Sequence, residues 1–262
     1  MAYDSELLNL AYARTGIGTA SLAYDLELTN FINSFFQEAG RRGVRLNLYG
    51  GTPLNRGFFA ERQRLSLDLD IAIPKGGRFN FDIINLRDTI KEMGYREVRS
   101  KLLEESFVAH VSKGEATIKV ELHRAEFAAK TQFIVLHPML EYYGLPLLTT
   151  KVPSYEFEYL LASKLHALAR RMIYRDVYDS FTGLQIVKDT GKLMRYVRSL
   201  DRERKTDAVG EITKRVAGED YGYRQAEDTV YEQLVPLRYR EDRGVMAEFI
   251  VAKLNEIAKL QK

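Results

Sequence analysis

The sequence predicts an α+β protein in which a mixed half, residues 1–150, precedes a helical half, residues 151–262. Two observations predict this division. Residues 65–73 and 117–123 alternate apolar and polar side chains with the period of two that half-buried strands require. Beyond residue 154, apolar residues instead recur at helical spacing. We interpret the halves as two domains, with the helical one contributing a lysine and an aspartate to a site in the first.

The individual elements follow from the same periodicities and from glycine and proline breaks. In the first half we expect helices over 22–40 and 82–93, and strands over 44–49, 65–73, 105–111 and 117–123. In the second half we expect helices over 155–172, 177–189, 191–205 and 244–260. Between the halves, prolines and glycines indicate a looser joint at Pro138, Gly144, Pro146 and Pro153.

Composition excludes several classes of protein. The 262 residues are 45% hydrophobic, which suits a folded chain with a substantial core. The net charge of +3 is too small to indicate a nucleic-acid binder by itself. The absence of cysteine excludes disulfides and zinc–thiolate sites. The first residues lack a signal-peptide pattern and no apolar run could span a membrane, so we expect a cytoplasmic protein that does not bind membranes.

Two acids lie on one face of the predicted strand 65–73. Its odd positions are all apolar, whereas its even positions include Asp68 and Asp70. Side chains two apart on a strand share a face, about 7 Å apart at the backbone, so the two carboxylates can converge on Mg²⁺. The alternative is an amphipathic strand with two solvated acids. On 117–123, Glu121 occupies the polar face in the same way and is either a third acid of the site or an exposed strand acid.

A glycine turn, Gly50-Gly51-Thr52, separates the strand 44–49 from a short helix that Pro53 would begin. Glycine lets the backbone approach a ligand closely, and free amides at a helix start favour phosphate. Thr52 adds a hydroxyl. Turns use glycine for many other reasons, so the turn gains meaning only from its position ahead of Asp68 and Asp70.

Lys164 falls inside the apolar stripe of the predicted helix 155–172. A buried ammonium needs an anion nearby, which indicates a phosphate or an acidic site. The alternative is a lysine at the edge of the stripe that reaches water. Downstream, Asp176 either belongs to the same site or caps a helix that begins at Val177.

These motifs together resemble a known family. Gly50-Gly51-Thr52 followed by Arg64-x-Ser66-x-Asp68-x-Asp70 resembles the signature of polymerase-β-like nucleotidyltransferases. Lys164-Leu165-x-Ala167-Leu168 with Arg175-Asp176-x-x-Asp179 is similar to the second half of the pattern in AbiEii/AbiGii-type abortive-infection toxins, which include the MenT-like toxins. Two departures occur: Pro53 replaces the usual alanine, and Leu67 stands where an acid is common.

The resemblance implies a polymerase-β-like mixed sheet with flanking helices and a transfer of a nucleotide from an NTP to an acceptor hydroxyl. It implies that one or two Mg²⁺ ions are bound by Asp68, Asp70 and Glu121. It implies NTP contacts from Gly50, Gly51, Thr52, Arg64, Ser66 and Lys164. Lys164 would neutralise the leaving pyrophosphate, and Asp176 would orient Lys164 or Arg175 or contact the base or sugar.

The acceptor implied by the family is RNA, notably the tRNA 3′ end, and family toxins are encoded with a cognate antitoxin. Residues 192–205 give separate support, because a basic stripe on one helical face suits an RNA backbone. The stripe comprises Arg195, Arg198, Arg202 and Lys205, and tyrosines that could stack on bases are Tyr221, Tyr223 and Tyr231. A solvated helix face is the alternative for the stripe. Other open functions are a nucleotidyltransferase acting on small molecules, on proteins or on itself, and a non-catalytic interaction protein.

Overall fold

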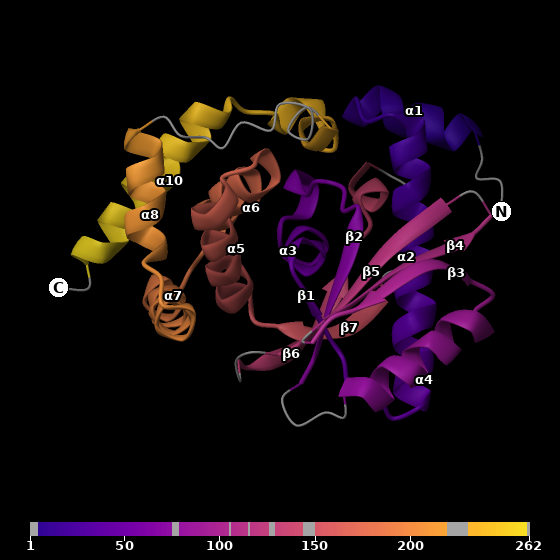
Figure 1. Ribbon diagram of the computed structural model, residues 1–262. Coiled ribbons are helices and arrows are strands. Elements are labelled where there is room, and N and C mark those ends of the chain that lie inside the picture. The colour runs from indigo at the N-terminus through magenta and orange to yellow at the C-terminus, as the bar shows by residue number, and fades with distance from the viewer. Residues whose placement is uncertain are drawn as a thin grey trace.

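A computed structural model describes residues 5–74, 79–104, 106–114, 116–125, 129–143, 150–218 and 230–260 (Figure 1). Its strands are β1 Asn47–Tyr49, β2 Asp68–Ile73, β3 Arg96–Leu102, β4 Ser106–Lys113, β5 Ala116–Arg124, β6 Thr131–Leu136 and β7 Thr150–Tyr155. They form one mixed seven-stranded sheet in the order β3-β4-β5-β2-β1-β7-β6. The predicted α+β class, with a mixed sheet, flanking helices and a helical second half, is confirmed.

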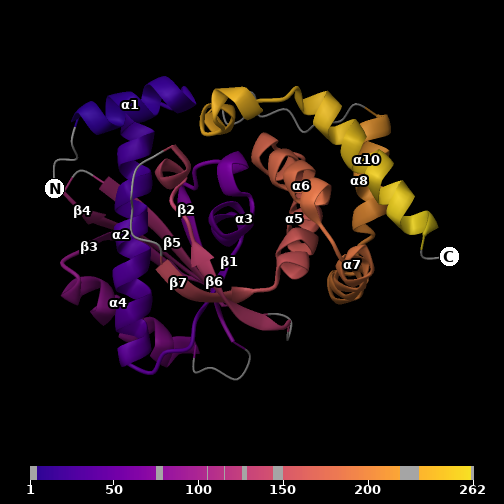
Figure 2. The same cartoon turned by 180° about the vertical axis from the view of Figure 1, so that it is seen from behind.

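Helices cover both faces of this sheet. They are α1 Ser5–Thr15, α2 Thr19–Arg41, α3 Gly51–Phe58, α4 Phe79–Glu92, α5 Phe157–Arg171, α6 Tyr174–Ile186, α7 Thr190–Arg204, α8 Ala208–Ala217 and α10 Arg243–Lys259. In Figures 1 and 2, α2 and α4 lie against one face, and α3 stands between the other face and the C-terminal helices. No helix in the described ranges is both long and apolar enough to cross a bilayer.

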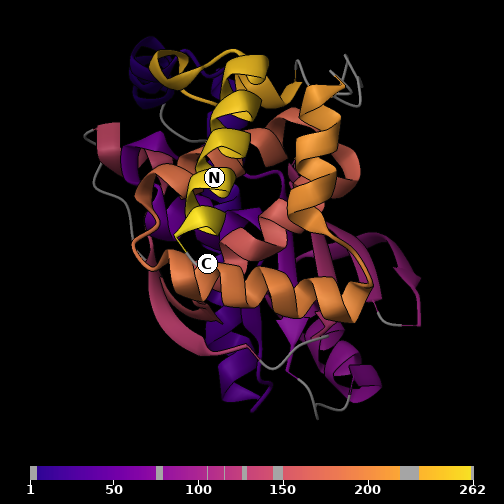
Figure 3. The ribbon, with the colours of Figure 1, turned by 90° about the vertical axis from the view of Figure 1, so that its left-hand side faces the viewer.

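Two large apolar clusters hold these layers. Phe31 and Phe35 of α2 and Leu86 of α4 pack on the sheet face that carries Leu69 and Val120. A second cluster joins α5, α6, α7, α8 and α10 to one another and reaches α3. Figure 3 shows α7 running crosswise to α8 and α10. The opposite face of β2 and β5 is therefore left between α3 and α5, where polar side chains can gather.

The register of the central strands confirms the predicted alternation on β2. Leu69, Ile71 and Ile73 are buried, so Asp68 and Asp70 point together to the other face. β2 runs parallel to β5 and places Asp70 directly beside Glu121. The strand that carries the two aspartates and the strand that carries the glutamate are thus immediate neighbours.

Some predicted elements have the wrong extent, and some elements of the structure were not predicted. The strand predicted over 44–49 is only Asn47–Tyr49, and the joint predicted before residue 154 contains β7, in which Pro153 pairs with Phe133 of β6. The elements α1, α8, β3 and β6 were not predicted. The helix predicted from Val177 begins at Tyr174, with Ile173 at its N-cap, so Asp176 lies in its first turn and is not its cap. Gly144, Pro146, Tyr221 and Tyr223 lie outside the described residues.

Candidate active site

The glycine turn lies against the acid strand. Gly50 has φ +74°, and a Cβ there would stand 2.2 Å from an Asp70 carboxylate oxygen, so only glycine fits. A Cβ on Gly51 would stand 2.7 Å from Arg64 Nη2 and 3.4 Å from Lys164 Nζ. The Thr52 hydroxyl donates to the backbone carbonyl of Asp68 at 3.0 Å. The turn and the first residue of β2 are therefore joined directly.

The three predicted acids come together at this turn. Burial disfavours the charged carboxyl of Asp70, and Asp68 and Glu121 add repulsion, which together raise its pKa to about 7. Burial also acts on Asp68, but Arg175, Arg64 and Lys164 outweigh it and hold the pKa of Asp68 below its usual range. Carboxylate oxygens suit hard, oxygen-seeking cations, so a site built from Asp70 and Glu121, with Asp68 two residues along β2, fits a divalent ion such as Mg²⁺.

Glu121 has a basic neighbour on each side along β5. Lys119 Nζ lies 2.6 Å from Glu121 Oε2, and His123 Nε2 lies 3.4 Å from Glu121 Oε1. Single ligand atoms of Asp70, Glu121 and His123 all lie within 4.8 Å of one another, a spacing that one metal ion could occupy. His123 was not predicted as a site residue, although its place on the polar face of this strand was evident from the alternation.

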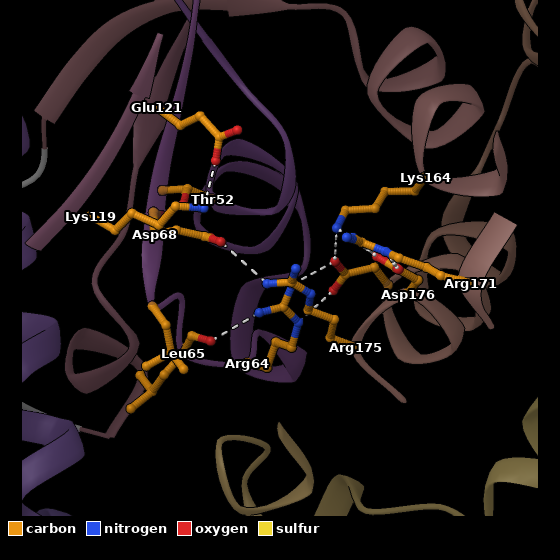
Figure 4. Close-up of polar contacts among 12 residues, drawn as sticks. Thr52, Arg64, Leu65, Asp68, Lys119, Glu121, Lys164, Arg171, Arg175 and Asp176 are labelled. Carbon is orange, nitrogen blue, oxygen red and sulfur yellow. Dashed lines mark hydrogen bonds and ion pairs between the residues drawn. The ribbon is translucent and has the colours of Figure 1, made fainter. Parts of the chain in front are cut away.

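Lys164 is buried, as its position in the apolar stripe predicted. Its ammonium group is paired with two aspartates. Its ammonium lies 3.1 Å from Asp176 Oδ1 and 3.0 Å from Asp179 Oδ2. Burial works against the charge, but Asp179 and Asp176 more than compensate and raise the pKa of Lys164. Asp176 also accepts hydrogen bonds from Arg171 (Figure 4). The lysine therefore does not reach solvent by snorkelling but anchors α5 to α6.

Asp179 is the residue that ties this helical pair to the glycine turn. Arg64 donates to it through Nε at 2.9 Å and through Nη2 at 2.7 Å, and Asn55 Nδ2 donates at 2.9 Å. Burial would raise the pKa of Asp179, but Arg64 and Lys164 lower it to about 2. Asp179 was not predicted as a site residue, because its partners lie 115 and 124 positions away in the chain.

The only role predicted for Arg175 was that Asp176 could orient it. In the structure, Arg175 contacts Asp68 directly. Its Nη1 lies 3.2 Å from Asp68 Oδ2, with side chains 17% and 23% exposed (Figure 4). Its guanidinium also lies 4.7 Å from the ring centroid of Tyr231. Arg175 thus brings a positive charge from α6 to the edge of the acid cluster, in the open part of the site.

A cleft of about 900 Å³ connects these groups. Its acidic wall carries Asp68, Asp70 and Glu121, and its basic wall carries Lys164, Arg170, Arg171, Arg175 and Arg204. Such a cleft can accept a polyanion on one side and a cation on the other. Of the predicted nucleotide contacts, Gly51, Arg64 and Lys164 line it, but the Arg64 guanidinium is held by Asp179. Ser66 is 2% exposed and does not line it.

A tight glycine turn, acids on two adjacent strands and a basic wall across the cleft together define a nucleotidyltransferase. A family model described as "Nucleotidyl transferase AbiEii toxin, Type IV TA system" matches residues 41–248. The chain belongs to the AbiEii nucleotidyltransferase toxin family. Membership in a toxin–antitoxin family implies a nucleotide substrate and an antitoxin partner.

A solved structure agrees with the fold. MenT4, a nucleotidyltransferase toxin from Mycobacterium tuberculosis H37Rv, superposes with a TM-score of 0.61 at 16% identity, covering 97% of this chain and 89% of that one. ANT(2″)-Ia, solved in complex with adenylyl-2″-tobramycin, gives a TM-score of 0.45 at 13% identity over 69% of this chain and 99% of that one. No curated protein matches the chain significantly.

Proposed function

We propose that this chain transfers a nucleoside monophosphate from an NTP to an acceptor hydroxyl with the help of one or two Mg²⁺ ions. The observation that carries the proposal is the parallel register that sets Asp70 beside Glu121, with Asp68 two residues away and Gly50 in contact. Two acids directly opposite each other repel, and burial together with repulsion from Asp68 and Glu121 raises the pKa of Asp70 to about 7. A bound divalent cation would remove the repulsion between these carboxylates.

Asp68, Asp70 and Glu121 would hold the cation, which when bound supplies charge neutralisation of the triphosphate. The acceptor oxygen attacks the α-phosphorus, and the bond from that phosphorus to the oxygen bridging to the β-phosphate breaks, so pyrophosphate leaves. The hydroxyl proton passes to a carboxylate, and Glu121, 22% exposed, is either this base or a ligand of the cation.

The basic wall suits the triphosphate. Arg175 is partly exposed in the cleft and already pairs with an anion there, so it is the group best placed to contact a phosphate. Gly51 lines the cleft at the start of α3, and the amides at a helix start favour anions. Lys164 and Asp176, buried and paired with each other, would act on the nucleotide chiefly by fixing the turn through Asp179. Thr52, Arg64 and Ser66 would support the turn from within.

As the acceptor we favour RNA, including the tRNA 3′ end. We place the reaction in the cytoplasm, which contains both NTPs and RNA. Arg195, Arg198 and Arg202 are exposed on α7 and line a groove of about 840 Å³. Arg204, on the same helix, lines the catalytic cleft. Basic side chains both in this groove and in the cleft suit a phosphate backbone.

The experiment incubates the protein with each labelled NTP, Mg²⁺ and total RNA. We expect label on RNA, and no label with Asp68→Ala or in EDTA. Aminoglycoside acceptors and mass spectrometry of the protein itself are run in parallel, because they identify small-molecule or protein modification. Label on those acceptors alone would remove RNA from the proposal, and the absence of transfer to every acceptor with all four NTPs would favour a non-catalytic interaction protein.

A further inference from the structure

The polar faces of β2 and β5 meet in three cross-strand pairs. Asp68 lies opposite Lys119, Asp70 opposite Glu121, and Ala72 opposite His123. The first pair is of opposite charge, although Lys119 bonds to Glu121 and Asp68 pairs with Arg175. The second pair is of like charge, so its two carboxylates repel each other. In the third pair Ala72 has only a methyl group, so no long side chain on β2 competes with the imidazole for space next to the acids.

The two oxygens of Glu121 face different neighbours. Oε2 accepts from Lys119 Nζ at 2.6 Å, whereas Oε1 lies on the His123 side, 3.4 Å from Nε2. On β2, Asp68 has Arg175 as its cationic neighbour at 3.2 Å. The pocket for the cation that Asp70 and Glu121 hold therefore extends toward His123, on the side of Glu121 away from Lys119.

The spacing of these groups is that of metal ligands. One ligand atom each from Asp70, Glu121 and His123 lies within 4.8 Å of the others. Ligand atoms around a cation with bonds of about 2.1 Å stand roughly 3 to 4 Å apart, so small side-chain rotations would bring all three into contact with one ion. The His123 side chain is 35% exposed on the cleft surface, which leaves it room to rotate.

We propose that His123 provides a ring-nitrogen ligand to the divalent cation bound by Asp70 and Glu121, and that this nitrogen makes the site bind Mn²⁺ more tightly than Mg²⁺. The inference rests on the proposed function in so far as the acids hold a cation. Mg²⁺ takes oxygen ligands almost exclusively. Mn²⁺ also favours oxygen ligands, but as a first-row transition ion it accepts an imidazole nitrogen more readily than Mg²⁺ does. His123 would thus set the metal preference.

The test uses the full chain without nucleotide. Mn²⁺ affinity is measured from the electron paramagnetic resonance signal of the free ion, Mg²⁺ affinity by competition, and nitrogen ligation by ¹⁴N modulation of the electron spin echo. The variant His123→Gln keeps polarity and length but lacks the ring nitrogen. The matched control is His110→Gln. His110 lies on β4, the strand next to β5, and pairs with Lys119 of β5.

We expect ¹⁴N modulation in the wild type and in the His110 variant, and its loss in His123→Gln. Mn²⁺ affinity should fall about tenfold in His123→Gln, while Mg²⁺ affinity changes less than about threefold. Modulation that persists in His123→Gln, or an equal fall for both metals, overturns the inference but leaves the proposed function intact. If Asp70→Asn and Glu121→Gln bind both metals as the wild type does, the acid site itself is wrong, and the proposed metal-dependent function fails with it.

Discussion

At the scale of single residues, Gly50 is under two separate constraints. Its φ of +74° and ψ of −146° lie in a region that essentially only glycine populates, and a Cβ there would overlap the Asp70 carboxylate. The first constraint concerns stability, and the second concerns the acids. A substitution at this position therefore affects both, and a control must separate them.

We predict that Gly50→Ala abolishes nucleotide transfer and lowers the free energy of unfolding by about 1–3 kcal/mol or more. The matched control is Gly43→Ala, at a φ of +69° with no atom within 4 Å of the added Cβ. It should lose about 1 kcal/mol of stability and retain activity. Chemical denaturation and the transfer assay measure the two effects. Wild-type activity in Gly50→Ala would show that Asp70 needs no close approach by the turn.

Asp179 is buried with Arg64 and Lys164, and its depressed pKa makes stability depend on pH. The pKa is about 2 in the folded protein, against 3.8 for the unperturbed group. The unfolded state therefore binds the proton first as pH falls, so this stabilisation is complete above about pH 4 and is lost as pH drops through about 2. The shift corresponds to about 2 kcal/mol.

We predict that the free energy of unfolding of the wild type decreases from pH 5 toward pH 2 and that Asp179→Asn has a shallower decrease over this window. Asp176, whose pKa is also lowered by Lys164 and Arg171 against the effect of burial, contributes in the same direction. Urea denaturation at several pH values gives the slopes. Equal slopes for the wild type and Asp179→Asn would contradict the assignment of this linkage to Asp179.

At the scale of elements, the Thr52 hydroxyl joins the start of α3 to the start of β2 through the Asp68 carbonyl. This single bond fixes the turn relative to the first acid. We predict that Thr52→Val, which keeps the shape but loses the donor, reduces stability by about 1 kcal/mol and reduces transfer. Thr52→Ser keeps the hydroxyl and should retain most of both. If Val and Ser behave alike in denaturation and transfer assays, the hydrogen bond has no such role.

Sequence periodicity located the acid strand because one side of β2 is fully apolar and the other is not. It could not locate β3, whose residues Arg96–Leu102 are nearly all exposed and follow no alternation. It also misread β7, because Pro153 is a poor indicator of a strand that lies inside a sheet. Strands without a strong apolar face are defined by their neighbours, which local sequence does not reveal.

The same reasoning explains which residues of the candidate site could be predicted from the sequence and which could not. Asp68, Asp70 and Glu121 could be proposed because strand geometry puts alternate residues on one face. Asp179 and Arg175 act through contacts with Arg64 and Asp68 that span more than one hundred residues. Their importance depends on how the helical half packs against the sheet. No spacing rule predicts that packing.

At the scale of the whole molecule, the proposed division into residues 1–150 and 151–262 stays a prediction. The sheet continues to Tyr155. Two ion pairs, Arg64 with Asp179 and Asp68 with Arg175, join the first part to the helices. The catalytic cleft is built from both parts. We therefore expect nucleotide transfer to require residues from both parts, whichever boundary is drawn.

The distribution of charge over the surface gives a fourth prediction. Reversing Arg195, Arg198 and Arg202 of α7 to glutamate should weaken RNA binding at least tenfold at low salt and lower the salt slope by about 2, because about 0.7 is lost per phosphate contact. The matched control reverses three exposed cations away from α7, Lys91 of α4 and Arg96 and Lys101 of the edge strand β3, for the same change in net charge. Filter binding across a salt series measures both. Equal losses in the two variants would indicate an effect of net charge alone.

The contacts of the glycine turn have a consequence for biosynthesis. Residues 50–125 contain the turn and all three acids, yet Gly51 and Arg64 rest against Lys164 and Asp179, which the ribosome makes more than one hundred codons after the turn. A nascent chain that has emerged only through its acids therefore lacks the side chains that lock the turn. The cleft is completed late in translation, when α5 and α6 have left the exit tunnel, so we expect incomplete chains to lack nucleotide transfer.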